Sequence, residues 1–373
     1  MAGTGLDRLS ARAAPFWLRP QAVLSGATAE VAVSEGRALP LAGGVFGLAF
    51  AEVEIVVRDA ANEAGMSCTI VSLESAKRWA AASGVSARHD GLLQALTTPR
   101  EPWAGLDFNR PRIMGILNVT PDSFSDAGDH LDAAAAIAGG KAMVEAGADI
   151  LDIGGESTRP GAEPIDPAEE IRRVEPVVRE LASAGALISI DTRHARTMRA
   201  ALAAGARIIN DVSALTADPE SLSVAARSGA PVVLMHMRGD PRTMQDDPIY
   251  ACAPLDILDY LQERIEACLA GGVKRSRIVV DPGIGFGKRL RHNLQIMSRL
   301  SLLHLTACPI LVGASRKSFI SSTVHRGIPA KARLPGSLTA GLVALEQGVQ
   351  ILRVHDVAET WQAAEVWRGI RAA

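Results

Sequence analysis

Residues 187–211 read LISIDTRHARTMRAALAAGARIIND, and this stretch carries the pattern that decides the fold. A short apolar run, Leu187–Asp191, precedes an Ala-rich segment with helical apolar spacing, and a second apolar run, Arg207–Asp211, follows it. Both runs are nearly all apolar rather than alternating, which is typical of parallel strands covered on both faces. The stretch therefore predicts a strand–helix–strand unit.

The same pattern starts near Arg112 and continues to the end of the chain, with helical segments such as Ala133–Ala146, Pro167–Ala184 and Pro254–Ala270 between the runs. Eight units in roughly 260 residues match a closed (β/α)8 TIM barrel of about 250 residues. An open doubly wound sheet is the alternative, but the count of eight and the lack of a G-x-G-x-x-G motif after the first run favour the barrel. The eight runs are Ile113–Val119, Asp149–Gly154, Leu187–Asp191, Arg207–Asp211, Val232–His236, Ile278–Asp281, Ile310–Gly313 and Ile351–Val354.

Residues 1–105 have a different character. They contain Gly-rich turns, one predicted strand (Ala51–Val57) and one predicted helix (Leu73–Ala82), and no catalytic motif. Pro99 and Pro102 indicate a linker. We therefore expect an N-terminal α/β appendage over 1–105, used for packing or association, and a barrel domain over 106–373.

Polar groups stand at or just after the carboxyl ends of most runs, where a barrel gathers its chemistry at one mouth. Some of them could simply cap the next helix, because Asp and Asn are good N-caps. Capping does not explain why Asp191 and Asp281 close apolar runs, since a buried carboxylate is costly unless it is paired. We therefore expect a ligand that offers hydrogen-bond donors. The polar groups are Asn118, Glu156, Asp191, Asn210 with Asp211, His236, Asp281 and His355.

Three loops after the runs have the composition of ligand-binding segments, although the first, taken alone, fits a plain turn and the second fits a solvated loop. The loop from Asn118 to Asp126 offers an amide and a carboxylate oxygen, which suit a Mg²⁺ ion that keeps waters and takes its other ligands from phosphates. The loop at 154–161 is Gly-rich and supplies a hydroxyl and a guanidinium. The loop at 281–288 offers the Phe286 ring; it is not a P-loop, because G-x-x-x-x-G-K-[ST] is missing.

The last two runs lead into basic residues. Barrels often bind phosphate with the loops after strands seven and eight. Arg353 lies inside an apolar run and so needs a buried partner. These positions favour an anion site over plain surface charge, and they hold Arg316, Lys317, Arg353 and His355.

Bulk composition excludes several classes of protein. A formal net charge of −2 gives no case for a nucleic-acid partner. Four scattered cysteines without a C-x-x-C pair argue against disulfides or a zinc site. The first residues lack the apolar region of a secretory signal, and the most apolar early stretch, Leu41–Val57, contains two glutamates. We expect a cytoplasmic protein that does not enter a membrane.

Eight motifs in order resemble those of dihydropteroate synthases, a family of pterin-binding (β/α)8 barrels. The resemblance runs from about Arg112 to the C-terminus. The motifs are NVTPDSFS at 118–125, GGESTRPGA at 154–162, IDT at 190–192, IND at 209–211, LMHM at 234–237, DPGIGFGK at 281–288, GASRKS at 313–318 and RVHD at 353–356.

The resemblance implies a role for each matching residue. Asp191, Lys317, Arg353 and His355 would form the catalytic set, and Asn118 with Asp126 would hold Mg²⁺. Asn118, Arg353 and His355 would contact the diphosphate of the substrate. The pterin would be bound by Thr158, Asp191, Asn210, Val212, Met235, Asp281 and Lys317, and p-aminobenzoate by Phe124, Thr158, Arg159, Pro160, Phe286 and Ser318.

The reaction that this family catalyses joins 6-hydroxymethyl-7,8-dihydropterin diphosphate to p-aminobenzoate, and it needs no side-chain nucleophile. Cations and Mg²⁺ would stabilise the departing diphosphate, and carboxylates would favour the cationic methylene left behind. The resemblance also implies a homodimer. It leaves the role of residues 1–105 open.

Two other functions compete with this one. A pterin-binding methyltransferase would keep the ring-binding Asp and Asn residues, but it would not need the basic set at 315–318 and 353–355 or Ser157–Pro160. A non-catalytic pterin-binding paralogue would be expected to lose Asn118, Arg159 or Lys317, and none is lost.

Overall fold

The computed structural model of the chain describes residues 15–119, 129–156, 165–239 and 243–372. Within these residues, eight parallel strands form one sheet in the order β10-β9-β8-β7-β6-β5-β12-β11. An isolated parallel bridge between Val280 and Ile310 joins its two ends, so the sheet closes. The predicted barrel is confirmed. The strands are β5 (Arg112–Asn118), β6 (Ile150–Gly154), β7 (Ile188–Asp191), β8 (Ile208–Asp211), β9 (Val232–Met235), β10 (Ile278–Asp281), β11 (Leu311–Val312) and β12 (Ile351–Val354).

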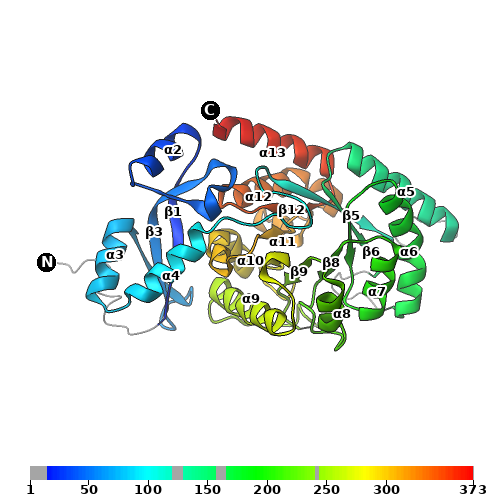
Figure 1. Cartoon of the computed structure of the whole chain (residues 1–373), viewed down its shortest axis with the longest axis horizontal. Helices are drawn as coiled ribbons and strands as arrows, with labels where there is room; N and C mark the ends of the chain where they lie inside the picture. Colours follow the sequence, from blue (N-terminus) through cyan, green and yellow to red (C-terminus); the bar gives the residue numbers. More distant parts are fainter. Residues whose placement is uncertain (1–14, 120–128, 157–164, 240–242, 373) are drawn as a thin grey trace.

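Helices surround this sheet (Figure 1). The start of α6 is set by local sequence: Asp166 accepts a hydrogen bond from the amide of Ala168, and Pro167 occupies the first turn. The helices are α5 (Asp129–Glu145), α6 (Pro167–Ser183), α7 (Ala195–Ala204), α8 (Ser221–Ser228), α9 (Ala253–Ala270), α10 (Leu290–Met297), α11 (Ser318–Thr323), α12 (Leu334–Glu346) and α13 (Val357–Ala372), with 3-10 turns η4 (Arg275–Arg277), η5 (Leu300–Thr306) and η6 (Ala330–Ala332).

The strand register sets the polar residues at one level. Asp191 pairs with Asn210 on one side and with Gly154 on the other, and Asp281 pairs with Met235. Because parallel strands all point the same way, their carboxyl ends lie at one mouth of the barrel.

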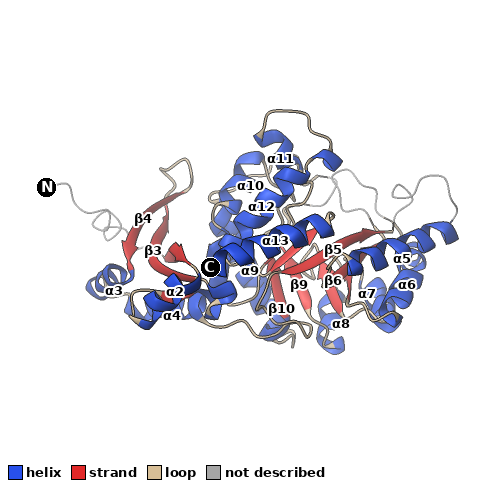
Figure 2. Ribbon diagram, turned by 90° about the horizontal axis from the view of Figure 1, so that it is seen from above, coloured by secondary structure: helices blue, strands red, loops and turns tan. Residues whose placement is uncertain are grey.

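The N-terminal part is an antiparallel sheet with helices packed around it, apart from the barrel strands (Figure 2). The expected α/β appendage is therefore present, and the predicted helix Leu73–Ala82 and the strand near Ala51–Val57 are confirmed. Its other elements were not predicted. The elements are β1 (Phe16–Leu24), α2 (Gly26–Ser34), β2 (Leu39–Pro40), η1 (Leu41–Gly43), η2 (Val45–Gly47), β3 (Ala49–Arg58), β4 (Met66–Ser72), α3 (Leu73–Ala82) and α4 (Ser86–Thr97).

The N-terminal sheet shares its core with the barrel. Buried apolar residues of both parts form one continuous cluster, in which β1 and α4 pack against η5. Arg58 at the end of β3 pairs with Asp256 of α9 at 2.5 Å, and the indole of Trp103 donates to the carbonyl of Arg277 at 2.9 Å. The division drawn at 105/106 lies in the connection between α4 and β5, and this connection is itself packed on the barrel.

Candidate active site

A pocket with about 340 Å³ of empty space, part of it open to solvent, lies at the carboxyl ends of the barrel strands, where a barrel gathers its ligand-binding groups. Its lining comes from β7 to β12 and the loops that follow them. The lining residues are Asp191, Asn210, Val212, Met235, Asp281, Gly283, Ile284, Phe286, Gly313, Lys317 and Arg353.

Arg353 joins two carboxylates in the wall of this pocket. Its Nε donates to Asp152 Oδ2 at 2.6 Å and its Nη2 to Asp191 Oδ2 at 2.7 Å. The amide of Asn210 donates to the same Asp152 oxygen at 2.9 Å. Asp152 is fully buried. The buried partner that Arg353 requires is therefore supplied by the chain itself, without a bound anion.

Burial dominates the protonation of the pocket carboxyls. It raises the pKa of Asp191 to about 7; Arg353 acts against this shift, and Asp152 adds to it. Burial also raises the pKa of Asp281, although the amide of Gly283 donates to its Oδ1 at 2.7 Å and Lys317 lies near. Each of these carboxyls accepts hydrogen bonds from N–H groups when it is ionised, and can also donate one when it is protonated.

Lys317 and Phe286 also line the pocket, and they contact each other. The Lys317 Nζ lies 4.0 Å from the centre of the Phe286 ring, close enough for a cation–π interaction. Phe286 belongs to a loop in which Gly283 and Gly287 have φ values of +65° and +61°. A Cβ at Gly283 would lie 2.0 Å from the carbonyl oxygen of His236, and a Cβ at Gly287 would lie 2.4 Å from that of Arg238. Only glycine allows this loop to lie so close to the end of β9.

The edge after β11 and β12 carries less positive charge than its basic residues suggest. Burial, with nearby Arg316 and Arg353, lowers the pKa of His355 to about 4, so its ring is neutral near pH 7. His355 Nδ1 lies 3.1 Å from Ser315 Oγ. Arg316 pairs with Asp356, with its Nε 3.0 Å from Oδ2. Of the four basic residues expected to form an anion site, His355 is therefore neutral and Arg316 is paired with Asp356, whereas Lys317 and Arg353 line the pocket.

A family model described as "Pterin binding enzyme" matches residues 114–355. The chain belongs to this family. Among curated members, it is 45% identical over 262 residues to the dihydropteroate synthase of Escherichia coli K12, covering 70% of this chain and 92% of that protein. It is 45% identical over 271 residues to the dihydropteroate synthase of Neisseria meningitidis serogroup B, covering 71% and 94%.

Solved structures of dihydropteroate synthases also resemble this chain. The Yersinia pestis dihydropteroate synthase, in a sulfonamide drug complex, matches with a TM-score of 0.68 and 45% identity, covering 72% of this chain and 97% of that one. The Xanthomonas albilineans enzyme in complex with 7,8-dihydropteroate matches with a TM-score of 0.64 and 42% identity, covering 71% and 95%. The family model begins at residue 114, so the N-terminal sheet lies outside it.

The residues expected to bind pterin in this family are mostly brought together. Of the other expected site residues, Asn118, His355 and Ser318 are described but do not line the pocket, and Ser318 is exposed at the start of α11. Phe124, Asp126, Thr158, Arg159 and Pro160 lie outside the described residues. Those that line the pocket are Asp191, Asn210, Val212, Met235, Asp281, Phe286, Lys317 and Arg353.

Asp152 was not predicted, although the sequence contained a signal for it. It stands inside the apolar run Ile150–Gly154, and an acid in such a run is the same feature that drew attention to Asp191 and Asp281. Because Asp152 lies two residues before the end of its strand, a prediction based on strand ends does not include it.

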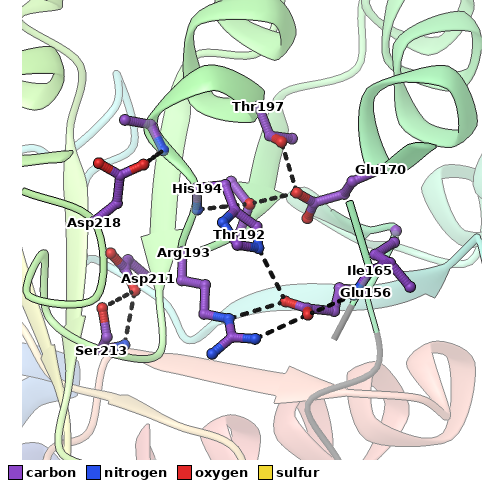
Figure 3. Close-up of polar contacts among 12 residues, drawn as sticks. Glu156, Ile165, Glu170, Thr192, Arg193, His194, Thr197, Asp211, Ser213 and Asp218 are labelled. Carbon is purple, nitrogen blue, oxygen red and sulfur yellow. Dashed lines mark hydrogen bonds and ion pairs between the residues drawn. The ribbon is translucent and has the colours of Figure 1, made fainter. Parts of the chain in front are cut away.

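Three strand-end polar groups have partners of their own outside the pocket lining. Figure 3 shows Glu156 facing Arg193, which donates to it at 3.0 and 3.1 Å. Burial alone would raise the pKa of Glu156, but His194 and Arg193 outweigh it and lower this pKa to about 2. Asp211 accepts from Ser213 and from the amide of Leu215, while burial raises its pKa to about 6. His236 contacts Lys288.

Proposed function

We propose that this chain acts as a dihydropteroate synthase, the transferase that joins a dihydropterin to p-aminobenzoate to give 7,8-dihydropteroate in folate biosynthesis. The observation that carries the proposal is the grouping of Asp191, Asn210, Asp281 and Lys317 in one pocket, in a chain 45% identical to a curated dihydropteroate synthase. The matching Xanthomonas albilineans enzyme has been solved with 4-aminobenzoic acid.

The pocket fits a flat heterocycle with several donors and acceptors. Carboxylates of Asp191 and Asp281 accept from ring N–H and amino groups, the Asn210 amide can do both, and Lys317 donates. Val212 and Met235 supply apolar surface for the ring faces. Hydrogen bonds to a charged partner are worth about 1.5–3 kcal/mol each, so these residues are sufficient to orient the pterin.

The leaving group is proposed to be diphosphate. Arg353 and neutral His355, at the end of β12, and Asn118, at the end of β5, would donate hydrogen bonds to it. The Arg353 guanidinium would keep its bonds to Asp152 and Asp191 and so hold a fixed orientation while the C–O bond breaks. Ionised Asp191 would favour the cationic methylene that remains. The arylamine nitrogen would then form the C–N bond to it and lose a proton to the departing diphosphate.

We include Mg²⁺ in this proposal. Among the described residues, no group of three or more His, Cys, Asp or Glu side chains could hold a metal. Mg²⁺ at this site would therefore take most of its ligands from phosphate and water, and one protein oxygen from Asn118. When bound, Mg²⁺ would neutralise charge on the diphosphate. Asp126, the other proposed ligand, lies outside the described residues.

A homodimer in the cytoplasm is the proposed state of the protein. Val366 and Ile370 are one turn apart on α13 and are 57% and 72% exposed, so a second copy could cover them. Among the described residues, no helix is both long and apolar enough to cross a bilayer. Light scattering of the purified protein would test the dimer, and Ile370→Glu should shift it toward monomer.

The decisive experiment mixes the protein with the pterin diphosphate, p-aminobenzoate and Mg²⁺. We expect dihydropteroate and diphosphate in equal amounts, with inhibition by a sulfonamide that competes with p-aminobenzoate. A methyltransferase or a non-catalytic paralogue would release no diphosphate.

Calorimetry then tests the pterin site. Asp191→Asn and Asp281→Asn should each weaken pterin binding at least tenfold, while Asp90→Asn, an exposed change in α4, should not. Unchanged affinity in both pocket variants would contradict the proposed site.

A further inference from the structure

The loop Gly283–Gly287 is held by side chains of residues that lie outside it. Gln245 Nε2 donates to the carbonyl of Gly285 at 2.7 Å, and the Tyr250 hydroxyl donates to that of Gly287 at 2.8 Å. The carbonyl between them, that of Phe286, accepts from Lys288 Nζ at 2.9 Å. Three successive carbonyls are thus each bonded to a different side chain. A segment with three glycines has little conformational preference of its own, so these bonds determine its shape.

Lys288 is the most deeply buried of the three side chains that bond the loop carbonyls. Its side chain is buried, and its Nζ also lies 3.2 Å from the carbonyl oxygen of His236 and 2.9 Å from His236 Nδ1. Burial lowers the pKa of Lys288 well below its usual range, with Asp281 opposing and Lys317 adding to the shift. Either form is satisfied: the ammonium donates three bonds, and the neutral amine donates two and accepts one from Nδ1–H.

His236 is fixed in turn by its neighbours. Its ring packs edge-on against Tyr260, with centroids 4.9 Å apart, and lies 5.9 Å from the ring of Tyr250. Burial, with the nearby Lys288, lowers the pKa of His236 well below its usual range, so the ring is neutral. Lys288 therefore connects a rigid strand end, that of β9, to the backbone that carries the Phe286 ring.

We propose that Lys288 is a positioning residue of the active site. By bonding the carbonyl of Phe286 to the end of β9, it sets the Phe286 ring against Lys317 and so shapes the place where the second substrate binds. Lys288 does not itself line the pocket, and it acts through Phe286. This inference rests on the proposed function, in which Phe286 contacts p-aminobenzoate.

The test compares, for the full chain, the KM for p-aminobenzoate from steady-state kinetics with the dissociation constant for the pterin. Lys288→Met keeps an unbranched side chain that is one atom shorter, and it removes the three bonds that Nζ makes. We expect it to raise the KM for p-aminobenzoate at least tenfold, with the dissociation constant for the pterin changed less than threefold. Tyr250→Phe, a milder change that removes only the bond to Gly287, should raise the same KM two- to fivefold.

Tyr260→Phe is the matched control, because Tyr260 packs on the same histidine without contacting the loop. It should leave both constants unchanged. A double-mutant cycle of Lys288→Met with Phe286→Leu should be strongly non-additive if Lys288 acts through Phe286. Additive effects, or equal losses for both substrates, would overturn the inference. Absence of product from the wild type would instead overturn the proposed function, which is measured first.

Discussion

Asp152 determines how Arg353 is oriented in the pocket. One of its oxygens accepts from both Arg353 and Asn210, so a single buried atom connects β6, β8 and β12. Arg353 thus bonds two carboxylates, which stabilise its charge and raise its pKa above the usual range. This arrangement orients the guanidinium before any substrate arrives, and preorganised charge of this kind is what lowers a barrier.

We predict that Asp152→Asn weakens pterin binding at least tenfold and lowers the free energy of unfolding by about 3 kcal/mol, since it breaks a buried pair. Calorimetry and urea denaturation would measure the two effects. Asp149→Asn is the matched control: Asp149 pairs with Arg110 and Arg112 at the opposite end of β6. It should lower stability and leave pterin affinity unchanged. Equal loss of affinity in both variants would contradict the role of Asp152.

Asp191 should make stability depend on pH. Its folded-state pKa of about 7 lies above the unfolded value of about 3.9, so the folded protein holds a proton that the unfolded chain releases. This contribution is complete below about pH 4 and is lost as pH rises through 7. From pH 5 to 8, the wild type should therefore lose on the order of 3 kcal/mol more stability than Asp191→Asn. Urea denaturation at several pH values would test this, and parallel curves would refute it.

At the scale of elements, the seam between β10 and β11 is where the barrel has the fewest ladder bonds. β11 has two residues, and one bridge joins Val280 to Ile310. A side chain on the β12 side supports the β11 edge of this seam: the buried Gln350 Oε1 accepts from the amide of Ile310 at 2.7 Å. An unsatisfied amide at this point would be costly, because it lies away from water.

Gln350→Met should therefore destabilise the protein by about 1–3 kcal/mol and speed hydrogen exchange at the Ile310 amide. The control is Gln347→Met, which removes bonds to Met297 and Ser301 but none at the seam. Both variants should be less stable, yet only Gln350→Met should raise exchange at Ile310. Unaltered exchange in that variant would show that the seam does not depend on this side chain.

At the scale of the whole molecule, the N-terminal sheet and the barrel should unfold together. Their buried apolar residues form one cluster, and ion pairs such as Arg58–Asp256 cross between them. A unit with one continuous core is expected to lose its structure in a single transition.

Leu18→Ala in β1 tests this cooperativity, since Leu18 is fully buried in the shared core. It should lower the free energy of unfolding by about 2–5 kcal/mol. In urea, tryptophan fluorescence and catalytic activity should fall together at a lower midpoint than in the wild type. Val31→Ala, at a half-exposed position of α2, should change little. Activity that survives the fluorescence change would show two independent units.

Local pattern was sufficient to predict the architecture and the candidate pterin site. Apolar runs of strand length and Ala-rich helical spacing are properties of neighbouring residues, and a parallel barrel places every strand end at one mouth. Asp191, Asn210 and Asp281 could therefore be grouped from the sequence pattern, whereas Lys317 was assigned to the pterin only by the family resemblance. All four line the pocket.

Pairing and charge state were decided only by the tertiary structure. Arg353 is 201 residues from Asp152, and closure of the barrel is what makes them partners. His355 reads as a cation in the sequence, but burial makes it neutral. Lys288 reads as a basic loop residue, but it is a buried anchor. The physical reason is that both bonding and desolvation depend on which distant segments surround a side chain, and no local pattern records that.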